Sequence, residues 1–141
     1  MLNLENKIAI VTGCGSQKDG WGNGRAIATL LARQGATVIG TDLNIEHANN
    51  TKDYILKEGK VCEVYKVNMV VYKEVDAFFK TILEKDDNDT NVFLEVKEAN
   101  LPAVKLYIDL GFEEVDRKER YYSDGSNAIF MLKKNKKYGL V

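Results

Sequence analysis

The chain has 141 residues, of which 45% are hydrophobic and 29% are charged, with a formal net charge of −1. This length and composition are typical of a soluble globular protein, and we expect a cytoplasmic one. The charge balance argues against a nucleic-acid partner, and no apolar run approaches the roughly 20 residues of a membrane span. One histidine and two cysteines, at no ligand-like spacing, argue against a metal site.

A glycine-rich stretch between an expected strand and an expected helix is the clearest signal in the chain. Apolar and β-branched residues over Lys7–Thr12 favour a buried strand, and Arg25–Ala32 is rich in helix formers. Five glycines lie between these segments: Gly13, Gly15, Gly20, Gly22 and Gly24. Glycine allows backbone N–H groups to approach an anion, and a helix N-terminus favours phosphate. We therefore predict a phosphate-binding loop, with a tight turn that binds nothing as the alternative.

Strands and helices then alternate along the chain. We expect strands at Thr37–Asp42 and Val61–Val67, and helices at Ile45–Glu58 and Lys73–Lys85. Such alternation implies right-handed βαβ crossovers and a parallel sheet, with strand order 3-2-1 in this half.

Residues 5–85 resemble the N-terminal half of the short-chain dehydrogenase/reductase family. Its Thr-Gly-x3-Gly-x-Gly loop is recognisable in Thr12, Gly13, Gly22 and Gly24, although Ser16–Trp21 lengthens the loop. The resemblance implies that these glycines lie against the pyrophosphate of a dinucleotide.

The same resemblance implies two further cofactor-binding residues. Asp42 ends the second strand, where the family places an acid on the adenosine ribose, and a carboxylate there favours NAD over NADP. Asn68 stands where the family contacts adenine. A simple loop-capping role for Asp42 is the alternative.

The family's catalytic signature is not found in this sequence. The family uses a tyrosine with a lysine four residues later, and none of the seven tyrosines here has lysine at that position. We therefore expect a nucleotide-binding module without dehydrogenase activity.

The C-terminal residues have a different pattern. We expect a strand at Val92–Val96, a helix at Ala103–Leu110, and two strands, Phe112–Tyr122 and Asn127–Leu132, joined by a Ser-Asp-Gly-Ser turn. Asn100 and Pro102 are a typical helix start. The hairpin requires antiparallel pairing in this half.

Four segments stand out over residues 92–134: LEVKEAN (94–100), AVKLYIDLGFEEV (103–115), RYY (120–122) and AIFML (128–132). With them, this part of the chain resembles the C-terminal half of GNAT-type N-acetyltransferases, particularly those that acetylate ribosomal-protein N-termini. The resemblance implies Glu95 as general base, Tyr107 as general acid and Asn100 near the coenzyme A arm. Acyl transfer to an amine needs such a base and acid. Gln17–Gly22 also fits that family's pyrophosphate pattern, so acetyl-CoA is the alternative cofactor. A packing role for Tyr107 in the core is the alternative to catalysis.

Together these patterns predict one α/β domain over residues 1–141, built from the fragments 1–85 and 92–141 and joined at 86–91. The expected architecture is a three-layer sandwich with strand order 3-2-1-4-6-5, mostly parallel, in which Val92–Val96 pairs with the first strand. We expect the chain to be an engineered or recombined chimera, with a natural deletion fusion as the alternative. We expect it to act as a binding module and not as an active enzyme. Exposed edges at the third strand and at Phe112–Tyr122 suggest a homodimer through strand pairing.

Overall fold

A computed structural model describes residues 2–85 and 91–134. The chain divides into two compact units, Met1–Val75 and Asp76–Val141, which we call the N-terminal and C-terminal units. Helix α3 (Tyr72–Lys85) runs across this division. The expected junction 86–91 falls, except for Asn91, outside the described residues, and the single domain remains a prediction.

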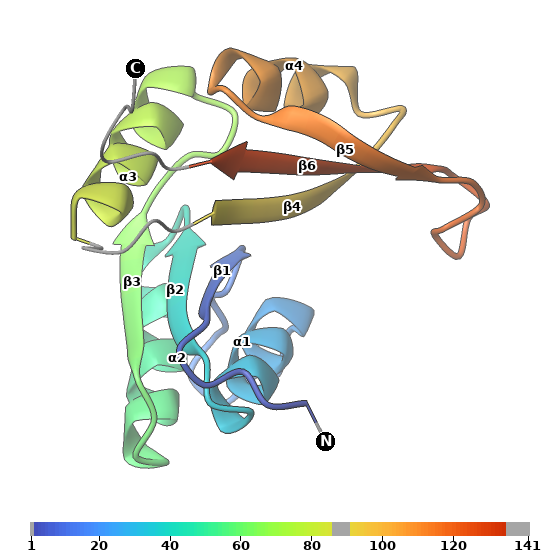
Figure 1. The fold of residues 1–141 in the computed structure, drawn as a ribbon. Coiled ribbons are helices and arrows are strands. Elements are labelled where there is room, and N and C mark those ends of the chain that lie inside the picture. Colours follow the sequence, from blue (N-terminus) through green and yellow to red (C-terminus); the bar gives the residue numbers. More distant parts are fainter. Residues whose placement is uncertain (1, 86–90, 135–141) are drawn as a thin grey trace. The chain divides into compact units, whose positions relative to one another are not determined.

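The N-terminal unit is built on a parallel sheet of β1 (Ile8–Thr12), β2 (Thr37–Asp42) and β3 (Cys62–Lys66), in that order. Helices α1 (Asn23–Arg33) and α2 (Ile45–Lys57) lie on one side of this sheet (Figure 1), as two right-handed crossovers require. The buried core between helices and sheet contains Val11, Cys14, Ala28, Ala32, Val38, Ala48, Ile55 and Cys62. The small alanines of both helices allow a close approach to the strands.

Local sequence explains where these two helices begin and end. The Asn44 side chain caps α2 by accepting hydrogen bonds from the amides of Glu46 and His47. After α1, Gly35 takes the left-handed conformation at φ 102° that turns the chain into β2. The C-terminal turns of the two helices are joined by an ion pair between Arg33 and Glu58 at 2.5 Å.

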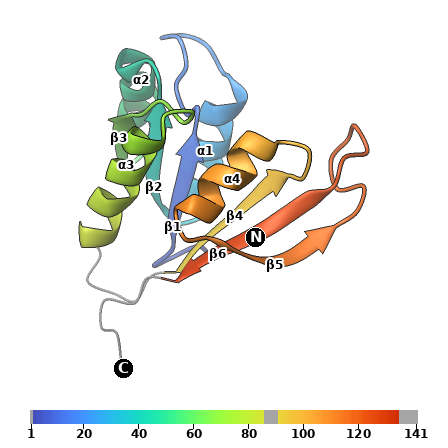
Figure 2. The same cartoon turned by 90° about the horizontal axis from the view of Figure 1, so that it is seen from above.

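The C-terminal unit contains an antiparallel sheet of β4 (Asn91–Lys97), β5 (Glu113–Lys118) and β6 (Ala128–Lys134), with β6 in the middle. Helix α4 (Leu101–Asp109) connects β4 to β5, and Figure 2 shows it beside the sheet. Asn100 caps this helix through the Ala103 amide, with Pro102 in the first turn, as predicted. The ring of Phe112 lies between Phe79 of α3 and Tyr107 of α4, at centroid distances of 5.7 and 5.6 Å.

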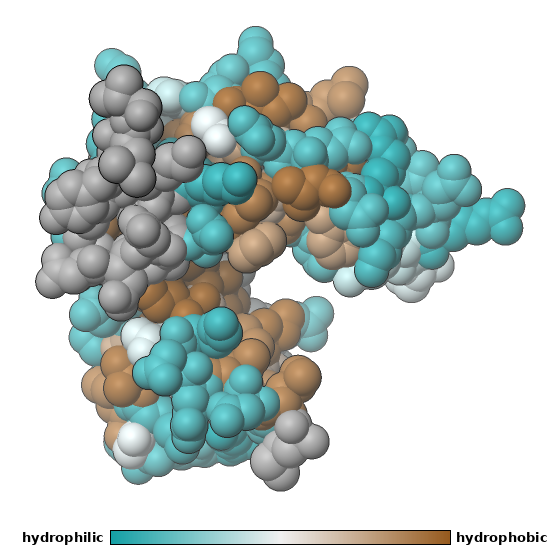
Figure 3. All heavy atoms as spheres, viewed as in Figure 1, coloured by the Kyte–Doolittle hydropathy of each residue, from teal (hydrophilic) through white to brown (hydrophobic). Residues whose placement is uncertain are grey.

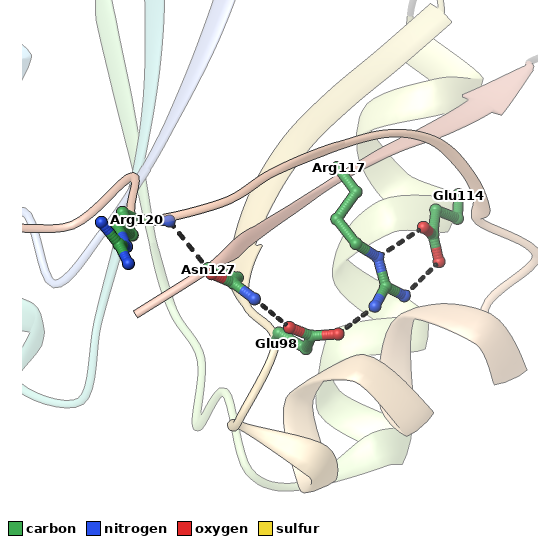
Figure 4. A network of polar contacts seen from close by, with 5 residues as sticks. All are labelled: Glu98, Glu114, Arg117, Arg120 and Asn127. Atoms are coloured by element: carbon green, nitrogen blue, oxygen red, sulfur yellow. Dashed lines mark hydrogen bonds and ion pairs between the residues drawn. The ribbon is translucent and has the colours of Figure 1, made fainter. Parts of the chain in front are cut away.

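A polar network joins β4 to the β5–β6 hairpin (Figure 4). Glu98 forms an ion pair with Arg117 and accepts a hydrogen bond from Asn127 Nδ2 at 2.8 Å, while Arg117 also pairs with Glu114. Asn127 Oδ1 in turn accepts from the amide of Arg120 at 3.0 Å. Because Arg120 has φ 49°, the strand ends at Lys118, earlier than the expected Tyr122.

The six-stranded order 3-2-1-4-6-5 is not confirmed, because the described strands form two separate three-stranded sheets. β4 pairs over its whole length with β6, and no described residue of β4 pairs with β1. Helix α3, which precedes β4, packs its Phe79 on Phe112 within the C-terminal unit. The fold is therefore α/β, with a parallel sheet and an antiparallel one, and the three-layer sandwich is likewise not confirmed.

The Phe112 contacts make a testable prediction about stability. Phe112 is only 2% exposed, whereas Phe93 on β4 is 70% exposed. We expect Phe112→Ala to lower the free energy of unfolding by about 3–5 kcal/mol, and Phe93→Ala to change it by less than about 0.5 kcal/mol. Urea unfolding followed by circular dichroism measures both, and equal effects would contradict this account of the core.

Candidate functional site

The glycines at the end of β1 allow α1 to begin directly against the strand. Gly13 has φ 64°, a conformation that favours glycine. A Cβ atom at Gly24 would lie 1.8 Å from the carbonyl oxygen of Gly13, so no side chain fits there. The amides of Asn23, Gly24 and Arg25 have no acceptor among the described residues. They remain available to an anion, as at other helix N-termini.

Asp42 lies beside this turn and holds it to the end of β2. Its Oδ2 atom accepts from the amide of Gly15 at 2.9 Å, and its Oδ1 atom accepts from the amide of Asn44 at 2.9 Å. A Cβ atom at Gly15 would lie 2.6 Å from Oδ2, so this contact requires glycine. Each carboxylate oxygen can accept more than one hydrogen bond, so Asp42 can cap the loop and still accept from a ligand hydroxyl.

Asn68 lies at the same end of the sheet as Asp42. The Val67 amide donates to the carbonyl oxygen of Asp42 at 3.1 Å, which places the chain after β3 next to the end of β2. Asn68 Oδ1 accepts from the amide of Val70 at 3.1 Å, and its own amide donates to Glu74 at 2.7 Å. The Asn68 Nδ2 group has no partner in the part of the chain that the structure describes. Exposed apolar side chains follow both strands, at Leu43 and Val70.

The lengthened part of the loop is folded onto α2. The amide of Ser16 donates to the carbonyl oxygen of His47 at 3.2 Å, and the Ser16 carbonyl accepts from Asn50 Nδ2 at 3.1 Å. Thr51 Oγ1 donates to the Cys14 carbonyl at 2.7 Å. These three bonds fix the loop in one position on the N-terminal half of α2.

Arg25 completes this attachment, and sequence reasoning missed it. The side chain is only 6% exposed, and its guanidinium carbon lies 4.6 and 4.7 Å from the ring centroids of Trp21 and Tyr54, which contact each other edge to face at 4.9 Å. Its Nη1 atom donates to the Gly20 carbonyl at 2.9 Å. The available signal was a tryptophan in the loop with an arginine four residues later, but the tyrosine that also contacts the arginine lies on another helix.

The structure gives less support than the sequence to two predicted features of the loop: the glycine at position 22 and the coenzyme A segment Gln17–Gly22. A Cβ atom at Gly22 would meet no atom closer than 3.9 Å, so the geometry does not require glycine there. In the segment Gln17–Gly22, the Gly20 carbonyl is already bound by Arg25 and by Ser16 Oγ, the latter at 2.5 Å. The coenzyme A role of that segment stays a prediction.

Cys14 has a packing role in the loop. Burial raises the pKa of its thiol to about 12, with further contributions from the charges of Cys62 and Asp42. A Cβ atom at Gly40 would lie 2.4 Å from Cys14 Sγ, so the thiol fills the space above that glycine. At neutral pH the thiol stays protonated and is a poor nucleophile.

In the C-terminal unit, the two residues implied in acyl transfer have different partners. Glu95 is exposed on β4, and its Oε2 atom accepts from the hydroxyl of Tyr121 at 3.0 Å. Tyr107 is half-buried against Phe112, and burial raises the pKa of its hydroxyl. The structure therefore brings Tyr121, and not Tyr107, into hydrogen-bonding contact with Glu95.

Comparison with known proteins gives similarity to two classes of enzyme. The chain is 41% identical over 81 residues to a 3-oxoacyl-(acyl-carrier-protein) reductase, FabG, of Vibrio harveyi, which covers 57% of the chain and 30% of that protein. It is 48% identical over 44 residues to an N-alpha-acetyltransferase of Sulfurisphaera tokodaii, which covers 31% of the chain and 26% of that protein. The chain thus spans less than a third of either relative. No protein-family model matches it.

Solved structures of oxidoreductases also align with this chain. A protein described as a short-chain dehydrogenase/reductase from Burkholderia xenovorans aligns with a TM-score of 0.56 and 30% identity, over 58% of the chain and 32% of its own. A metagenomic short-chain oxidoreductase in complex with NADP aligns at 0.52 and 26% identity, over 58% and 35%. A Haemophilus influenza protein described as a D-mannonate oxidoreductase, with bound NAD, aligns at 0.52 and 28% identity, over 60% and 28%. The chain therefore carries a Rossmann-like α/β module.

Residues 2–85 and 91–134 contain neither a metal-binding cluster nor a membrane-spanning helix. No group of three or more histidine, cysteine or acidic side chains is placed to hold a metal ion there. None of the helices in these ranges is both long enough and apolar enough to cross a membrane.

The glycine geometry predicts unequal effects of two similar substitutions. We expect Gly24→Ala to lower the free energy of unfolding by roughly 3 kcal/mol or more, because its methyl group would overlap the Gly13 carbonyl. Gly22→Ala should cost about 1 kcal/mol or less, because space is open and only a preferred N-cap residue is lost. Thermal or urea unfolding distinguishes the two. Equal tolerance would show that α1 does not begin against Gly13.

Proposed function

We propose that the N-terminal unit binds the adenosine and pyrophosphate part of an NAD-type dinucleotide, without dehydrogenase turnover. The observation that carries the proposal is the group of free amides at the start of α1, next to the Gly13 turn and the Asp42 carboxylate. Positive backbone dipoles for a pyrophosphate and an acid for a ribose thus lie at the same end of a parallel sheet, where such folds bind ligands.

Each predicted residue then has a role that its contacts permit. Gly13 and Gly24 keep side chains away from the pyrophosphate, and the amides of α1 bind it. Asp42 accepts from the ribose hydroxyls with the lone pairs that Gly15 and Asn44 leave free. Asn68 offers its free Nδ2 group to the adenine, with exposed Leu43 and Val70 as apolar neighbours. When bound, the dinucleotide would supply hydride chemistry, but the sequence lacks the tyrosine–lysine pair for the proton transfer.

Attachment of the loop to α2 supports binding by preorganisation. Arg25, Trp21 and Tyr54 hold the lengthened segment on the helix. The ordering of this loop is thus achieved on folding, and the free energy of ligand binding does not have to supply it. The negative charge of Asp42 disfavours a 2′-phosphate, so we propose NAD and not NADP.

Titration calorimetry with NAD and NADP tests this proposal. We expect heat with NAD, weaker binding of NADP, and a Kd for NAD raised about tenfold or more in Asp42→Asn, since hydrogen bonds to a charged group contribute about 1.5–3 kcal/mol. Asp53→Asn, which removes an exposed charge from α2, is the matched control and should leave Kd unchanged. Absence of heat at millimolar NAD would remove the proposal.

Acetyl transfer is the second candidate, because of the similarity to an N-alpha-acetyltransferase and the protonated, half-buried hydroxyl of Tyr107. In this case Glu95 would take the proton of the amine and Tyr107 would reprotonate the leaving thiolate of acetyl-CoA. We expect Tyr107→Phe to lower peptide acetylation tenfold or more. Tyr72→Phe, at an exposed position on α3, is the control. A full rate in Tyr107→Phe, or no acetylation by the parent chain, would contradict this role.

A further inference from the structure

Among residues 2–85 and 91–134, the two sheets have four edge strands, and only one of these four carries no protection against pairing with another strand. Three edges contain charged side chains: β3 (CEVYK), β4 (NVFLEVK) and β5 (EEVDRK), of which β5 also has an irregular register at Glu114–Asp116. The fourth, β1, has the sequence IAIVT, with no charge, proline or bulge. Charges, prolines and bulges are the usual devices that keep edge strands from associating.

The backbone of β1 is oriented for such pairing. The Lys7 carbonyl accepts from the amide of Thr37 on β2 at 2.9 Å. Because alternate residues of a strand direct their backbone groups to opposite neighbours, Lys7, Ala9 and Val11 face β2. The N–H and C=O groups of Ile8, Ile10 and Thr12 therefore point to the free edge of this sheet.

We propose that β1 is a self-association edge, where a second copy of this chain adds its own β1 in antiparallel orientation. With Ile10 opposite Ile10 of the second copy, Ile8 lies opposite Thr12, and all outward backbone groups are paired. The pairs are β-branched on both strands, which favours cross-strand packing. No charged residue of either β1 strand has to be placed in this pairing.

An exposed apolar residue on α1, Ile27, also favours a second copy of this chain as the partner of β1. A two-fold axis perpendicular to the sheet keeps both α1 helices on one face of the combined sheet. Ile27 of α1 is half-exposed and points away from the side that contacts α2 through Arg25 and Arg33. Hydrophobic surface is visible over α1 in Figure 3. Association of two copies would therefore also cover Ile27 on each, adding apolar burial to the backbone pairing.

This assignment differs from the edges that the sequence suggested. The third strand and Phe112–Tyr122 looked exposed, and they are edges of their sheets. Both contain charged residues, however, whereas β1 was expected to lie inside a larger sheet. The proposal does not depend on nucleotide binding.

Sedimentation velocity of the full chain at increasing concentrations tests the proposal. We expect the apparent molecular mass to rise from 15.9 kDa at low concentration to twice that value at high concentration. Ile8→Lys, at a position 38% exposed, should abolish the dimer, because a charge would be placed on the pairing edge. Val61→Lys, next to the opposite edge of the same sheet and 57% exposed, should leave it unchanged.

Amide hydrogen exchange of the parent chain gives a second readout that needs no substitution. Slower exchange at Ile8, Ile10 and Thr12 with rising protein concentration supports the proposal. Protection of these amides that is independent of concentration would show that another strand of the same chain covers the edge, and it would overturn the proposal. A parent chain that is monomeric throughout, or a dimer that survives Ile8→Lys or is lost in Val61→Lys, would also overturn it.

Discussion

The approach of Gly24 to the carbonyl oxygen of Gly13 is the contact on which the N-terminal unit depends. A Cβ atom would be 1.8 Å from that oxygen, so the helix can start here only with glycine at position 24. Once α1 starts here, the residues between the two glycines must leave the strand–helix turn and return to it. They do so across α2, where Ser16, Asn50 and Thr51 supply the hydrogen bonds. One steric requirement therefore fixes both the anion-binding end of the helix and the path of the long loop.

Two charged side chains hold this arrangement, in different environments. Asp42 accepts from backbone amides on both sides of it, so its charge stabilises the loop without an ion pair. Arg25 is buried against two aromatic rings and donates to a loop carbonyl, although its Nε atom has no partner among the described residues. The Asp42 carboxylate and the Arg25 guanidinium thus both hold the glycine-rich loop by hydrogen bonds to its backbone, at Gly15 and at Gly20. The charge that a ligand would meet is that of Asp42.

Sequence reasoning predicted the helices and strands well because their signals are local. Apolar periodicity, the Asn100–Pro102 helix start and the glycines after the helices each act within a few residues. The position of Asp42 at a strand end followed in the same way. The pairing of β4 did not, because nothing within Val92–Val96 states which edge it joins. The aromatic contacts of Arg25 were also missed, since they depend on the rotation of α2, which brings Tyr54 under the loop.

In the C-terminal unit, the two residues that the acetyltransferase resemblance implies differ in how their contacts hold them. The three strands of this unit pair with one another, and the ring of Phe112 lies between Phe79 and Tyr107 in its core. Packing constrains Tyr107, whose ring lies on Phe112, but it does not constrain Glu95, which is exposed and hydrogen-bonded to Tyr121. A base and an acid act together only when a substrate fits between them. Packing within the unit therefore sets the immediate contacts of Tyr107. The distance between Tyr107 and Glu95 that acyl transfer needs depends on how a substrate fits between them.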